Sequence, residues 1–143
     1  MSRNSLAAIA GGIAVIGAVA VGFWNLGSPA RERQIHQDLR TVQALDRLAD
    51  QIDNAWNHSN KVLPNNLDRI AANAAQDPTT HAPFLYHPKQ SSQYELCATF
   101  LTDNGKTAEQ NESPFWLHAK GDYCFQLDAS APPPQPPYSY DYY

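Results

Sequence analysis

An uncharged stretch of 21 residues, 6–26, limits what this chain can form more than any other feature of its sequence. As a helix rising about 1.5 Å per residue it reaches about 30 Å, the thickness of the hydrocarbon core of a bilayer. Phe23 and Trp24 lie near its end, where aromatic side chains favour the membrane interface. We therefore predict a transmembrane helix over residues 6–26, preceded by a short N-terminal segment of residues 1–5.

A cleavable signal peptide is the alternative interpretation of this stretch. Residues 18–20, Ala-Val-Ala, resemble a cleavage site, and residues 28–30, Ser-Pro-Ala, resemble one less closely. The apolar run is longer than the hydrophobic region of a usual signal peptide, which favours a retained anchor.

Small residues recur at every fourth position of the expected anchor. They share one side of the helix, and such a side lets the backbone of another helix approach closely. Their abundance in membrane spans in general is the competing explanation. The residues are Ala10, Ala14, Ala18 and Gly22.

The remainder of the chain is acidic. After Arg3 no charged side chain occurs before Arg31, and the residues from there on carry nine basic and 14 acidic side chains. A protein that binds nucleic acid neutralises phosphates with a basic patch, and no such patch is visible here. We therefore expect no nucleic-acid partner.

An amphipathic helix is predicted over residues 29–57. Ser28 is suited to cap it and Pro29 to occupy its first turn. Its apolar residues follow at steps of three and four, which defines one stripe along the helix. The stripe packs either on a sheet of the same domain, which we favour, or on a partner in a coiled coil. It contains Ile35, Leu39, Val42, Leu45, Leu48, Ile52, Ala55 and Trp56.

Three short strands are predicted after the turn signal Asp77-Pro78. They cover residues 84–87, residues 93–101, and either residues 115–118 or residues 122–127. In the second strand the apolar side chains alternate with the others, so that the two sets lie on opposite faces of the sheet. One face carries Tyr94, Leu96, Ala98 and Phe100, and the other carries Glu95, Cys97 and Thr99.

The only two cysteines, Cys97 and Cys124, are 27 residues apart in strand-like sequence. In a small exported domain such a pair indicates a disulfide, which stabilises by about 3 kcal/mol on loop-entropy grounds. Two buried free thiols in a cytosolic domain are the alternative. The arginines argue against export, because Arg31, Arg33 and Arg40 follow the expected span and only Arg3 precedes it.

A tail of residues 129–143 is rich in proline and tyrosine. Prolines favour extended polyproline II and have little to bury, so a disordered end is the simpler interpretation. The other interpretation is a docking segment, because tyrosine provides contact area at low entropic cost. The candidate docking residues are Tyr138, Tyr140, Tyr142 and Tyr143.

The order of these segments resembles type IV pilin-like proteins and the pseudopilins of type II secretion. The resemblance implies an α+β fold, in which an N-terminal transmembrane helix continues into an amphipathic helix packed on a small three-stranded antiparallel sheet. The family's prepilin signal places a glutamate near the start of the hydrophobic helix, whereas the first acidic residue here is Glu32. The resemblance is carried by Asp38, Leu39, Leu45, Leu48 and Ile52, and by residues 63–67, 77–86 and 94–98.

Catalytic and metal-binding patterns are not recognisable in the sequence. The five histidines do not form the pairs of a zinc site, and no nucleophile elbow, phosphate-binding loop or haem-attachment motif occurs. His81, His87 and His118 could meet across the sheet, although loop or exposed positions suit them better. We therefore expect no enzyme, no cofactor and no metal.

Together these features predict a non-catalytic, single-pass protein of a bacterial inner membrane. We expect residues 1–5 in the cytoplasm and residues 29–128 as a pilin-like domain in the periplasm. Its expected partners are the membrane and the other subunits of a larger membrane complex, in which it is an accessory or structural subunit. A pseudopilin of a secretion or pilus system, and a small periplasmic ligand-binding or enzymatic domain, are the alternatives.

Overall fold

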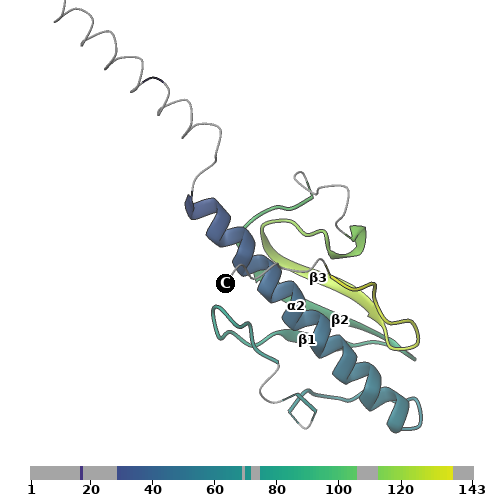
Figure 1. The fold of residues 1–143 in the computed structure, drawn as a ribbon. Helices are drawn as coiled ribbons and strands as arrows, with labels where there is room; N and C mark the ends of the chain where they lie inside the picture. The colour runs from purple at the N-terminus through teal and green to yellow at the C-terminus, as the bar shows by residue number, and fades with distance from the viewer. Residues whose placement is uncertain (1–16, 18–28, 69, 72–74, 106–112, 137–143) are drawn as a thin grey trace, which may run out of the picture. The chain divides into compact units, whose positions relative to one another are not determined.

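A computed structural model describes residues 17, 29–68, 70–71, 75–105 and 113–136. The chain divides into two compact units, Met1–Arg33 and Gln34–Tyr143, and the fold below belongs to the second, apart from residues 29–33 at the start of its helix. Its elements, labelled in Figure 1, are helix α2 (Pro29–His58), strands β1 (Leu85–Pro88) and β2 (Gln93–Phe100), the 3-10 turn η1 (Pro114–Trp116) and strand β3 (Gly121–Asp128).

Helix α2 begins and ends where its sequence predicts. Pro29 is its first residue, a position at which the missing N–H of proline has no cost. It ends at His58 because Asn60 and Lys61 adopt left-handed backbone angles, with φ of 52° and 64°. The N–H of Lys61 then turns back to the carbonyl oxygen of Trp56, 3.1 Å away, and satisfies an acceptor that the helix end would leave free.

The sheet is a three-stranded antiparallel meander in the order β1-β2-β3. A short turn joins β1 to β2, with Ser91 at φ 62°. Of the two alternatives for the third strand, residues 122–127 are the correct one, and residues 115–118 overlap η1 instead. The predicted α+β arrangement of one helix on a small antiparallel sheet is confirmed.

The core lies between α2 and one face of the sheet, as Figure 1 shows. Leu45, Leu48 and Ile52 on the helix are fully buried, and they share one apolar cluster with Leu96 and Phe125. Burying a leucine or isoleucine contributes about 1.5–3 kcal/mol, so this stripe supplies much of the stabilisation of the domain. The stripe therefore packs on the domain's own sheet, as predicted.

Among the described residues no helix is both long enough and apolar enough to cross a bilayer. The span predicted for residues 6–26 lies outside them except for Gly17, and so does its small-residue side, Ala10, Ala14, Ala18 and Gly22. Both remain predictions.

Candidate functional site

The predicted disulfide between Cys97 and Cys124 is confirmed. The two residues are direct partners in the antiparallel register of β2 and β3, with their Cα atoms 4.0 Å apart. The bond therefore joins the central strand of the sheet to an edge strand, and it closes a loop whose ends are 27 residues apart.

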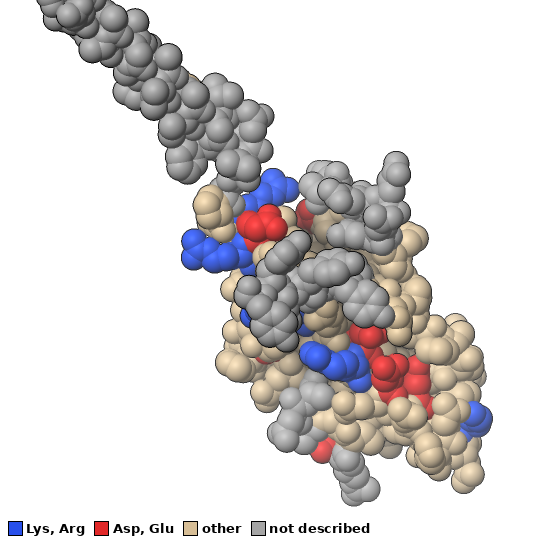
Figure 2. Space-filling view, in the orientation of Figure 1, with Lys and Arg blue, Asp and Glu red and all other residues tan. Residues whose placement is uncertain are grey.

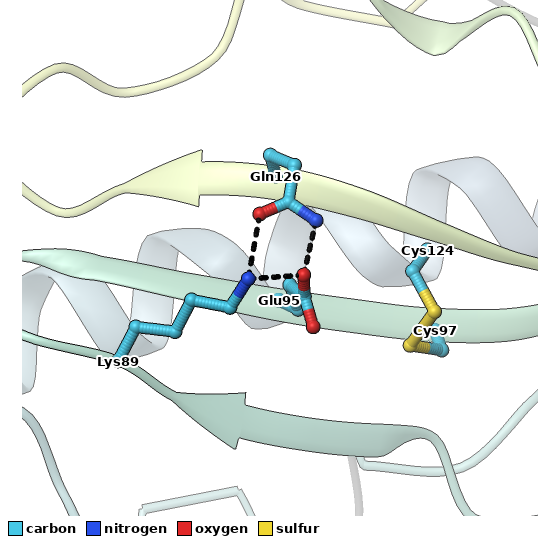
Figure 3. Close-up of polar contacts among 5 residues, drawn as sticks. All are labelled: Lys89, Glu95, Cys97, Cys124 and Gln126. Atoms are coloured by element: carbon cyan, nitrogen blue, oxygen red, sulfur yellow. Dashed lines mark hydrogen bonds and ion pairs between the residues drawn. A yellow bond between two sulfur atoms is a disulfide. The ribbon is translucent and has the colours of Figure 1, made fainter.

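Further cross-strand pairs accompany the disulfide on the sheet face that α2 does not cover. Glu95 accepts hydrogen bonds from Lys89 and Gln126, which lower the pKa of its carboxyl group (Figure 3). Two residues beyond Cys97 in the other direction, Thr99 donates to Asp122 at 2.6 Å. This face, which we call the outer face, is therefore linked at three successive positions along β2 and β3.

A groove of about 340 Å³ lies on the outer face beside the disulfide. The side chain of Leu85 on β1 is 57 % exposed there, although it pairs with the buried Cys97 in the register. His87 and Asp122 supply titratable groups to the groove lining. In chemical terms it is an apolar surface with a few polar groups at its margin.

Three buried aspartates join α2 to distant parts of the domain. Asp38 accepts hydrogen bonds from the backbone N–H groups of Leu101 and Thr102 at 2.8 and 2.7 Å, and from the Thr102 hydroxyl at 2.6 Å. These bonds fix the end of β2 to the first third of the helix. Asp38 precedes Val42 by four residues, so its position on the apolar stripe was the signal of its burial.

Asp77 makes the second connection, in which the helix supplies the donor and the loop supplies the carboxylate. Its carboxylate belongs to the loop and accepts a hydrogen bond of 2.6 Å from the hydroxyl of Thr41 on α2. Burial alone would raise the pKa of Asp77, but the hydrogen bonds from Thr41, Thr80 and Thr79 outweigh burial and lower it. The acid that marked a turn in the sequence therefore also anchors the turn to the helix.

Asp53 makes the third joint, through the hydroxyl of Tyr94, which donates to its Oδ1 at 2.9 Å. Burial raises the pKa of both groups. Asp53 is not among the apolar residues that define the predicted stripe, yet only 8 % of the residue is exposed. The reason is Tyr94, which lies on the face of the sheet that α2 covers, because its buried hydroxyl needs a polar partner.

The three histidines that could have met across the sheet have different environments. His81 and His87 are exposed, while His118 is buried and stacks on Phe100 with ring centroids 3.8 Å apart. Burial lowers the pKa of His118, against smaller opposing effects from Ala119 and Asp38. Within the described part of the chain no three His, Cys, Asp or Glu residues are arranged to hold a metal ion.

The first half of the tail contacts the domain at two points, which its proline content did not predict. Ala129 is buried, and the indole N–H of Trp116 donates to the carbonyl oxygen of Pro134 at 2.7 Å. Trp116 is itself 1 % exposed, so the bond joins the tail to the core. The candidate docking residues, Tyr138, Tyr140, Tyr142 and Tyr143, lie outside the described residues.

No family model, curated protein or solved structure matches this chain.

Proposed function

We propose that the chain is a non-catalytic, single-pass protein of a bacterial inner membrane. Residues 6–26 anchor it, and its pilin-like domain lies in the periplasm. There it serves as an accessory or structural subunit of a larger membrane complex.

The observation that carries this proposal is the disulfide between Cys97 and Cys124. Structural disulfides form and persist in oxidising compartments and are rare in the cytosol. A disulfide-containing domain that follows an uncharged stretch of 21 residues is typical of an exported domain with an N-terminal anchor. The bond outweighs the arginines at the start of α2, because charge bias influences orientation whereas a cytosolic disulfide would be reduced.

The buried carboxylates support a structural role. Asp38, Asp53 and Asp77 each accept a hydrogen bond that holds α2 against the sheet or a loop. Such bonds make the position of the helix relative to the sheet specific, since each buried acceptor is satisfied in one arrangement only. A rigid domain on a membrane helix suits a subunit that positions its neighbours.

Native mass measurement after gentle detergent extraction tests the proposal, and a complex larger than the monomer is expected. Ala14→Leu should weaken that complex, because a large side chain prevents close helix approach on the small-residue side. Val15→Leu, one position off that side, is the matched control and should leave the complex intact. A lone monomer under every mild condition would contradict the proposal.

A pseudopilin of a secretion or pilus system is the second candidate. The observation that favours it is the long helix α2 on a three-stranded antiparallel meander, the element order on which the resemblance depends. A conventional pseudopilin has a processed, methylated N-terminus on a hydrophobic residue. An intact mass that retains Met1 or Ser2 would exclude this candidate.

A further inference from the structure

The C-terminal half of α2 carries an acidic face. Asp46, Asp50 and Asp53 follow at steps of four and three and therefore lie on one side of the helix. Figure 2 shows acidic side chains gathered over this part of the molecule. Burial and then the charge of Asp50 raise the pKa of Asp46 to about 6, with Arg47 acting in the opposite direction. Repulsion between neighbouring carboxylates of this face therefore adds to the effect of burial.

Asp53 is the buried member of this face. It is 92 % buried, and while Oδ1 accepts the hydrogen bond from Tyr94, Oδ2 has no hydrogen-bond partner among the described residues. One helical turn later, the indole Nε1 of Trp56 is also buried without a partner in the described part of the chain. Buried polar atoms are nearly always paired, so this unpaired acceptor and this unpaired donor, three residues apart on α2, make the end of the helix a candidate binding site.

Both side chains line one cleft of about 440 Å³ at the end of the helix. The cleft already contains a cation that the chain itself supplies. The Lys61 ammonium lies 4.1 Å from the centroid of the Trp56 ring and donates to Oδ1 of Asn57. Carboxylates, amide oxygens and an aromatic face are the groups that bind ammonium and guanidinium ions. The lining residues that belong to α2 or to the turn after it are Asp50, Asp53, Asn54, Trp56, Asn57 and Lys61.

We propose that this cleft binds a lysine or arginine side chain of a partner protein, presented on an extended segment. The cation replaces Lys61 beside Asp50 and Asp53, and a main-chain carbonyl next to the cation accepts from Trp56 Nε1. Because Asp53 Oδ2 and Trp56 Nε1 are buried before binding, both contacts require the side chains of Lys61 and Trp56 to move. The carbonyl distinguishes a peptide from a free ammonium ion, which has no acceptor for the indole N–H. The inference rests on the proposed function, because that function supplies the partner subunit.

The experiment uses the ¹⁵N-labelled full chain in detergent and two blocked pentapeptides. One has arginine at the centre of four glycines, and the other has glutamine there. The readout is the indole N–H resonance of Trp56, assigned by its absence in Trp56→Phe. The arginine peptide should shift this resonance to saturation, and the glutamine peptide should not.

Substitutions of the lining sharpen the test. Asp53→Asn keeps an acceptor for Tyr94 but removes the charge, and should weaken binding about tenfold or more, as loss of a charge-assisted hydrogen bond does. Asp68→Asn, which removes an exposed charge elsewhere, is the matched control and should change nothing. Lys61→Met should tighten binding, because it removes the competing ammonium.

Three outcomes would overturn the inference: no shift with the arginine peptide in either the wild type or Lys61→Met, equal shifts with both peptides, or the same shift with spermidine or Ca²⁺ alone. A lone monomer in native mass measurements, together with specific arginine-peptide binding, would refute the proposed function and leave the site standing. An intact complex without peptide binding would refute the binding site and leave the proposed function standing.

Discussion

Asp38→Asn is the substitution for which the structure gives the clearest expected cost. Asp38 is 4 % exposed, and its two oxygens accept three hydrogen bonds from Leu101 and Thr102. Asparagine keeps one acceptor oxygen for Leu101 but places an NH₂ group where the second carboxylate oxygen accepted from Thr102. The two hydrogen bonds from Thr102 are therefore lost. Hydrogen bonds to a charged group contribute about 1.5–3 kcal/mol each. Because the Thr102 hydroxyl can rotate toward another acceptor, we expect a total loss of about 2–4 kcal/mol.

Urea unfolding of the full chain in detergent, followed by tryptophan fluorescence, measures this loss. In a domain of about 100 residues it corresponds to a decrease in Tm of roughly 8–16 °C. Thr102→Val removes only the hydroxyl and should cost about 1 kcal/mol. Asp68→Asn, at an exposed position, should stay within about 0.5 kcal/mol of the wild type. A loss below about 1 kcal/mol for Asp38→Asn would refute the view that this carboxylate joins α2 to β2.

Three further predictions concern the disulfide and the titrating groups. Cys97→Ser should lower the free energy of unfolding by about 2–5 kcal/mol, and maleimide should label no thiol of the denatured, unreduced wild type; two labelled thiols would disprove the bond. Hydrogen bonds hold the pKa of Asp77 below its usual value, so the wild type should lose stability as the pH falls below about 4. Thr41→Val should make this slope shallower in an acid-unfolding series, and an unchanged slope would count against the joint. Burial lowers the pKa of His118, so below about pH 6.5 only the unfolded chain takes up its proton and stability falls. His118→Phe should remove that contribution in urea titrations at several pH values, and identical pH dependence in both proteins would contradict it.

Much of the domain could be predicted because its signals are local. The steps of three and four from Val42 to Ile52 require a helix with one apolar side, and Pro29 restricts where that helix begins. The alternation from Tyr94 to Phe100 requires a strand with one buried face, since side chains change face at every residue. Cys97 has only one possible partner for a disulfide within the chain, because Cys124 is the only other cysteine.

The joints between elements could not be predicted, because their partners are distant in sequence. Asp38 accepts hydrogen bonds from Leu101 and Thr102, which lie 63 and 64 positions later in the sequence. The separation is 41 positions for Asp53 and Tyr94, and 36 positions for Thr41 and Asp77. An aspartate has the same local propensities whether it is solvated or buried, and only the packed sheet determines which donors it meets. For the same reason the sequence assigned Asp77 to a turn and left the choice between two third strands open. The tertiary structure also decided that His118 is buried and that Trp116 holds Pro134, because both follow from where the connection between β2 and β3 packs on the core.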